Sequence, residues 1–215
     1  MRKNKLLIFI SVILIGAFMV TGCSFSTVAT VNGEKITQAM VDQQTRLYIA
    51  DFEFQYQAPF DKEKSKILYQ QFENNAKRDL IKQSMLLQEA KKRGLTASDA
   101  EVNKTLEGAK VMLGDSEKNK GYQNYLKALK MNETEFKATL KKQILAGKVE
   151  DEVTKDVTVS DTEVVEYYIK HKAEYKKLLP EIKDDVTKDA LKAKKQKTLT
   201  DFGAKLQKAA TIEVK

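Results

Sequence analysis

Thr27-Val28-Ala29-Thr30-Val31-Asn32-Gly33 reads as a β-strand followed by a tight turn. Thr and Val are branched at Cβ and favour strands, and Asn-Gly is a preferred turn dipeptide. Near the other end of the chain, Thr211-Ile212-Glu213-Val214 alternates polar and apolar side chains. Because an isolated short strand leaves its backbone groups unpaired, we predict that the two segments pair and close the chain into one unit. The alternative is that both ends are frayed.

The residues between these two segments have a helical composition. Only Pro59 and Pro180 interrupt them, Trp is absent, and Lys, Glu, Gln, Ala and Leu dominate. These five residue types lose little side-chain entropy in a helix. The predicted fold class is therefore mostly α, with a small β pairing of the N- and C-terminal strands. We predict helices over residues 37–57, 62–93, 99–113, 121–130, 133–154, 161–171 and 181–208.

Several helix ends can be located from capping residues. Glu follows Ser98, Asn132 and Ser160 after three positions, which is the spacing of a capping box. Gly94 and Gly114 follow helical segments, and we predict that both are C-terminal caps in the left-handed conformation.

The N-terminus has the three parts of an export signal: basic residues, an apolar run from Leu6 to Val20, and small residues before Cys23. As a helix the apolar run spans about 22 Å, short of a hydrocarbon core of about 30 Å, so a permanent membrane span is the weaker alternative. Val20-Thr21-Gly22-Cys23 resembles the bacterial lipobox. The resemblance implies a lipoprotein signal peptide over residues 1–22, with Cys23 joined to fatty acyl chains such as palmitate. Otherwise Cys23 is a buried or free thiol.

Composition excludes several classes of function. Cys23 is the only cysteine and His171 the only histidine, so no internal disulfide, clustered zinc site or Ser-His-Asp triad is expected. No glycine-rich phosphate loop is present, so we predict no cofactor. Removing the three cations Arg2, Lys3 and Lys5 with the signal lowers the formal charge from +8 to +5. An exported chain rarely meets nucleic acid, so its lysine runs indicate a solvated face.

Five aromatic side chains lie within thirteen positions, and we identify them as candidate client-binding residues. Tyr48, Phe52 and Tyr56 share one helical face, whereas Phe54 lies off it and can face a cleft or solvent. The alternative is that the shared face is core. Methionines offer a similarly adaptable apolar surface, although packing is their default role. The complete candidate set is Tyr48, Phe52, Phe54, Tyr56, Phe60, Met112 and Met131.

The stretch from Val28 to Thr37 also resembles the opening of the SurA-type chaperone domain and of PrsA-type foldase lipoproteins. In that family the strand and turn lead into a first helix capped by a threonine, here Thr37. Residues 86–95, 136–144 and 157–168 support the resemblance, and residues 181–214 resemble the family's C-terminal helix and returning strand. The resemblance implies one SurA-like helical chaperone domain over residues 23–215, with a core at 27–175 and a C-terminal helix and strand at 178–215.

One departure from the family pattern bears on activity. PrsA-type proteins carry a parvulin-type prolyl isomerase domain at the place where this chain runs directly from Tyr175 to Pro180. That family's active site uses paired histidines, and His171 is alone. We therefore expect a non-enzyme, although the family name implies peptidyl-prolyl isomerase activity.

Three functional hypotheses follow. The first is an ATP-independent holdase, lipid-anchored on the extracytoplasmic face of the cell membrane, that assists the folding of exported proteins. Its partners are unfolded or partly folded chains and the membrane, with no nucleic acid, and a homodimer is left open. The second is an adaptor lipoprotein that binds one envelope partner, and the third is a PrsA-like foldase with isomerase activity. The PrsA-like layout favours a Gram-positive bacterium.

Overall fold

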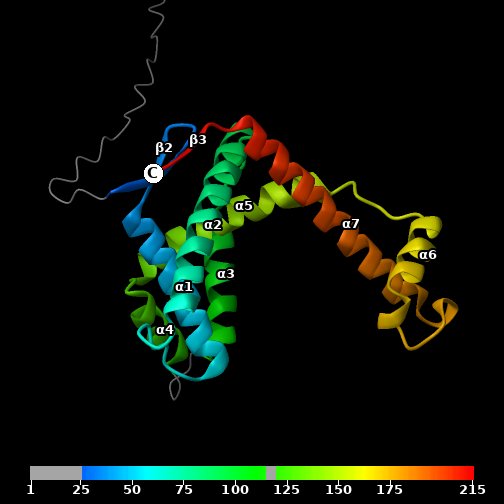
Figure 1. Cartoon of the computed structure of the whole chain (residues 1–215), viewed down its shortest axis with the longest axis horizontal. Coiled ribbons are helices and arrows are strands. Elements are labelled where there is room, and N and C mark those ends of the chain that lie inside the picture. Colours follow the sequence, from blue (N-terminus) through cyan, green and yellow to red (C-terminus); the bar gives the residue numbers. More distant parts are fainter. Residues whose placement is uncertain (1–25, 115–119) are drawn as a thin grey trace, which may run out of the picture.

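The computed structural model describes residues 26–114 and 120–215. The predicted signal peptide and Cys23 lie outside these residues. Figure 1 shows a body made of a small sheet and the first five helices, from which α7 runs outward to α6. The helices are α1 (Gln38–Tyr56), α2 (Lys66–Lys92), α3 (Asp99–Leu113), α4 (Gly121–Leu129), α5 (Glu133–Thr154), α6 (Asp161–Lys170), the short 3₁₀ helix η1 (Lys172–Glu174) and α7 (Leu179–Ala209).

The two ends of the described chain meet in one antiparallel sheet. Its strands are β1 (Thr27–Val31), β2 (Glu34–Thr37) and β3 (Ile212–Val214), in the order β2-β1-β3. Val31 pairs with Ile212, and Ala29 pairs with Val214. The predicted pairing of the N- and C-terminal strands is therefore confirmed.

Strand β2 was not predicted. Asn32 and Gly33 both have positive φ, 51° and 83°, as a two-residue hairpin turn requires, and the turn folds β2 back onto β1. Thr37 ends β2 and also caps α1, because its side chain accepts a hydrogen bond from the Met40 backbone N–H.

The capping predictions are confirmed. The boxes at Ser98, Asn132 and Ser160 each contain both reciprocal hydrogen bonds. Gly94 and Gly114 adopt left-handed φ values of 69° and 73°. These helix ends were predictable because a cap depends on residues within one helical turn of each other.

Two helix starts differ from the prediction. Helix α2 begins at Lys66 instead of residue 62, because the Asp61 carboxylate accepts the backbone N–H groups of Glu63 and Lys64 and holds a turn there. Helix α7 begins two residues early, at Leu179. Pro180 fits in its first turn, where a missing N–H breaks no helical hydrogen bond.

The body contains a continuous apolar interior. Leu106, Tyr122 and Leu129 are buried where α1, α3, α4 and α5 meet. A second cluster joins the sheet to α1 and α2, and a third, around Leu86 and Val149, fixes the C-terminal part of α7 against α2 and α5.

The other structural region is the arm, which we define as α6, η1 and the first part of α7, residues 161–190. Val164, Tyr168 and Val186 are its buried centre. Helix α6 packs on α7, and Figure 1 shows it at the far end of α7 from the sheet. In the described part of the chain, no helix has both the length and the apolarity needed to cross a membrane.

Candidate functional site

The predicted aromatic face of α1 forms a cluster with α2 and the loop between the two helices. The Phe52 ring lies 5.5 Å from Phe60 and 4.6 Å from Tyr56, and Tyr48 stacks on Phe72 at 5.7 Å, measured between centroids. Phe72 was not among the predicted residues. Phe72 lies on α2, and the spacing of residues along α1 does not show which α2 residue will face them.

Tyr48 links the aromatic cluster to a point about two turns further along α2. Its hydroxyl donates a hydrogen bond to the Asp79 carboxylate. Burial, followed by this bond, raises the pKa of Tyr48 to about 12. Tyr48 therefore stays neutral and anchors α1 to α2 at ordinary pH.

Phe54 points away from the aromatic cluster. Its side chain is 45% exposed and lines a groove of about 450 Å³ between α1, α3, α4 and α5, which we call the aromatic groove. Met112 lies on the same groove and is 71% exposed. Leu47, Ala109, Tyr125 and Phe136 contribute apolar surface to it.

The aromatic groove has a polar link between two of its walls. The Tyr125 hydroxyl on α4 donates to the Asp51 carboxylate on α1 at 2.8 Å. Burial, with a smaller contribution from Asp51, raises the pKa of Tyr125 above its usual range. The bond joins α1 to α4 at the wall of the groove.

The predicted client-binding residues thus separate into three groups. Phe54, Met112 and Tyr48 line the aromatic groove. Phe52, Tyr56 and Phe60 belong to the aromatic cluster beside it, although Tyr56 is 61% exposed. Met131 is partly buried against the body core.

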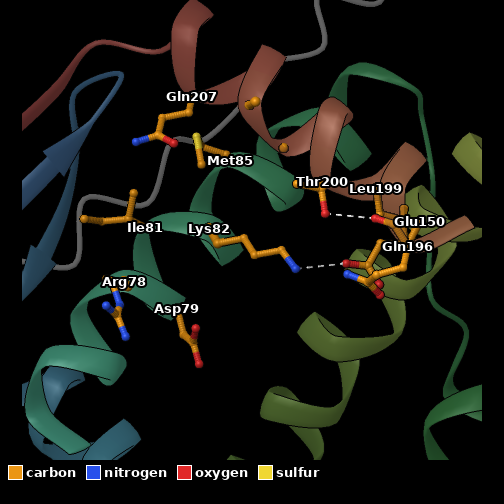
Figure 2. Close-up of a pocket in the computed structure, with 12 residues that line it drawn as sticks. Arg78, Asp79, Ile81, Lys82, Met85, Glu150, Gln196, Leu199, Thr200 and Gln207 are labelled. Carbon is orange, nitrogen blue, oxygen red and sulfur yellow. Dashed lines mark hydrogen bonds and ion pairs between the residues drawn. The ribbon is translucent and has the colours of Figure 1, made fainter. Parts of the chain in front are cut away.

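A second concavity, which we call the junction cleft, lies where α7 meets α2 and α5 and has a volume of about 600 Å³. Lys82 extends from α2 towards Glu150 on α5, with 3.3 Å between Nζ and Oε1 (Figure 2). Sequence reasoning missed this cleft because its walls come from three separated helices. Its lining residues are Arg78, Asp79, Ile81, Lys82, Met85, Glu150, Gln196, Leu199, Thr200, Gly203, Ala204 and Gln207.

His171 lies in the arm, stacked on Tyr167 at 4.3 Å, and its Nδ1 is 2.8 Å from the Glu174 carboxylate. Within residues 26–114 and 120–215, no group of three His, Cys, Asp or Glu side chains is placed to hold a metal ion. The linings of the two concavities combine apolar and polar side chains, which can contact apolar and polar groups of another molecule.

Comparison with known proteins finds relatives with similar sequences. The chain is 30% identical to the foldase protein PrsA of Clostridium perfringens over 152 residues, which cover 70% of this chain and 44% of that protein. It is 30% identical to a PrsA of Clostridium botulinum over 187 residues, covering 78% and 55% respectively. The chain thus spans about half the length of the curated relatives it matches.

A solved structure described as a SurA-like chaperone of Campylobacter jejuni superposes with a TM-score of 0.58 at 13% identity, covering 88% of this chain and 99% of that one. This similarity confirms the predicted SurA-like fold. The family model of the SurA-like N-terminal domain matches residues 1–150. The chain therefore belongs to the SurA-like N-terminal domain family.

Proposed function

We propose that the protein is an ATP-independent holdase that captures unfolded or partly folded exported proteins in the aromatic groove. The observation that carries the proposal is the exposure of Phe54 and Met112 on one groove. A rigid aromatic ring and a flexible thioether can contact many apolar segments without fixed geometry. Burying apolar surface contributes about 25 cal/mol per Å², so several small contacts give weak, reversible binding.

The lipid anchor is part of the proposal. Acylation of Cys23 would hold the groove on the extracytoplasmic face of the cell membrane, where exported chains emerge. Each buried methylene contributes about 0.8 kcal/mol, so two or more acyl chains give stable anchoring. The lipobox-like sequence supports this step, and the PrsA-like layout favours a Gram-positive cell. Mass spectrometry of the membrane-extracted protein tests it, and an unmodified Cys23 would contradict it.

We further propose that capture involves no prolyl isomerisation. Support comes from the short connection between η1 and α7, which consists of Tyr175 to Leu178, and from the place of His171 in the arm. A proline-turnover assay tests the proposal, and turnover above the uncatalysed rate would favour the foldase alternative.

The first experiment measures aggregation of a chemically unfolded client of near-neutral charge by light scattering, in the presence of residues 24–215. Raised salt screens charge attraction, so an apolar surface remains as the source of binding. We expect suppression at a near-stoichiometric ratio. Absence of suppression across several clients would contradict the holdase proposal and favour an adaptor with one partner.

Two variants locate the surface. Phe54→Ala removes an exposed ring from the aromatic groove, and Gly108→Leu fills the groove from α3, where a Cβ would have no heavy atom within 4 Å. Each is expected to raise the concentration for half-suppression about fivefold, the effect of about 1 kcal/mol. Gly147→Leu is the matched control, because Gly147 is equally open on α5 and lines neither concavity. An equal loss in the control would place the surface elsewhere.

A further inference from the structure

We infer that the junction cleft is a second binding site, and that it takes the extended backbone of an uncharged, apolar polypeptide segment. The inference deepens the proposed function and rests on it. The cleft and the aromatic groove share none of their lining residues.

Part of the cleft lining is apolar and adaptable. Met85 and Ile81 from α2 line it together with Leu199 and Ala204 from α7. Methionine has three rotatable bonds and a polarisable sulfur, so it can follow side chains of different shape. A volume of about 600 Å³ lies within the range of ligand sites in proteins.

The rim of the cleft matches a peptide backbone better than a charged ligand. Arg78 and Lys82 are cations, and Asp79 and Glu150 are anions, so the four formal charges cancel. A polyanion or a cation therefore meets no net opposite charge there. An extended chain, in contrast, presents N–H donors and C=O acceptors in alternation, and this rim offers both kinds of partner.

The α7 side of the rim adds exposed amide groups. Gln196 and Gln207 both line the cleft and are exposed, so their side-chain amides are accessible to a ligand. Each amide provides two donors and one acceptor oxygen, the complement of a peptide unit. Six of the twelve lining residues belong to α7, and this part of α7 lies outside the region that the family model matches.

Gly203 gives a direct way to close the cleft. It lies at the centre of the α7 wall, its φ is not positive, and a Cβ built there has no heavy atom within 4 Å. Leucine at this position therefore fills the cleft without removing a contact, and it has a higher helix propensity than glycine.

The test uses the full-length chain in nanodiscs of zwitterionic lipid, with empty nanodiscs as the blank. The probe is an eight-residue peptide of alternating Val and Thr, acetylated and amidated so that it carries no charge. Its analogue has two N-methylated backbone amides, which lose their donors but keep the side chains. Isothermal titration calorimetry measures both affinities.

We expect the N-methylated analogue to bind the native chain about tenfold more weakly than the parent peptide, the effect of one to two lost hydrogen bonds. Gly203→Leu should abolish this difference, whereas Gly108→Leu, which fills the aromatic groove, should retain it. Gly147→Leu controls for substitution of a helical glycine.

Three results would overturn the inference. One is that the parent peptide does not bind, or that both peptides bind equally. Equal binding would leave at most an apolar site for lipid or side chains. Another is an undiminished N-methylation effect in Gly203→Leu. The third is a change of sedimentation mass in Gly203→Leu, which would identify the cleft as a contact between two copies. None of these removes suppression of aggregation through the aromatic groove, so the inference and the proposed function fail separately.

Discussion

The body and the arm use the same helix caps but have very different amounts of core. The largest body cluster contains nine buried residues, whereas the arm cluster contains three, Val164, Tyr168 and Val186. Helix α6 is fixed to α7 by this cluster and by the ion pair between Glu163 and Lys194, which lies just beyond the arm on α7, at 2.5 Å. The difference indicates that the arm can open while the body stays folded, because opening it exposes little apolar surface.

The largest expected effect is in the body. Leu106→Ala leaves a cavity in the main cluster, where the leucine is 2% exposed, and should lower the free energy of unfolding by about 3 kcal/mol. Urea denaturation followed by circular dichroism measures the change. Ile169→Ala, at a site that is 66% exposed on α6, is the control and should change it by less than about 0.5 kcal/mol. Similar values for both variants would contradict the assigned core.

A cavity in the arm should act locally. Val186→Ala removes a side chain with no exposure from the arm cluster, and about 2 kcal/mol should be lost from the stability of α6 against α7. Hydrogen exchange is expected to accelerate in α6 and remain unchanged in α1 to α5. Acceleration across the whole chain would show that body and arm unfold as one unit.

Capping residues give a smaller, matched comparison. Ser160→Ala in the arm and Ser98→Ala in the body remove equivalent capping boxes, each stabilising by about 1 kcal/mol. We expect the first to appear as faster local exchange in α6 and the second as a lower midpoint of global unfolding. The comparison fails if both variants change the global midpoint alike.

The smallest effect is a dependence on pH. The Lys194 ammonium, together with the Ser160 backbone N–H, lowers the pKa of Glu163 below its usual 4.5. A carboxylate with a lowered folded-state pKa stabilises above its unfolded pKa, and the contribution is lost as pH falls through the folded value. The protection of α6 amides, measured relative to their intrinsic exchange rates at each pH, should therefore fall as pH drops below about 4.5, and Glu163→Gln should remove that part of the dependence.

The matched group in the body is Glu101. Its hydrogen bonds from Lys148 and then from Ser98 lower its pKa to about 2. Its contribution should persist to lower pH than most carboxylates allow, and unfolding curves of Glu101→Gln and the native chain should converge only near pH 2. Convergence already at pH 4 would contradict the lowered pKa.

Structural features that depend on neighbouring residues were predictable from the sequence. Features that depend on a distant partner were mostly not. The capping boxes and the left-handed glycines involve residues within one turn of each other, so their patterns were sufficient. Strand β2 was missed because Glu34-Lys35-Ile36-Thr37 is short and shows one apolar position, and it becomes a strand only by pairing with β1. The pairing of β1 with β3 was predictable because each end of the chain has a strand pattern, and the backbone groups of a single short strand require a second strand.

The candidate site shows the same division. Residue spacing was enough to establish that Tyr48, Phe52 and Tyr56 share a face of α1 and that Phe54 does not, because helical geometry is set by the backbone. Which side chains are covered depended on folding. Helix α2 brings Phe72 against Tyr48 and Phe52, whereas Tyr56 stays 61% exposed. Helices α3 and α4 leave Phe54 on an open groove. The junction cleft required folding altogether, since Met85, Glu150 and Gly203 become neighbours only when α7 returns to the body. Periodicity along one chain orients side chains, but contacts between helices are selected by the packing of the whole core.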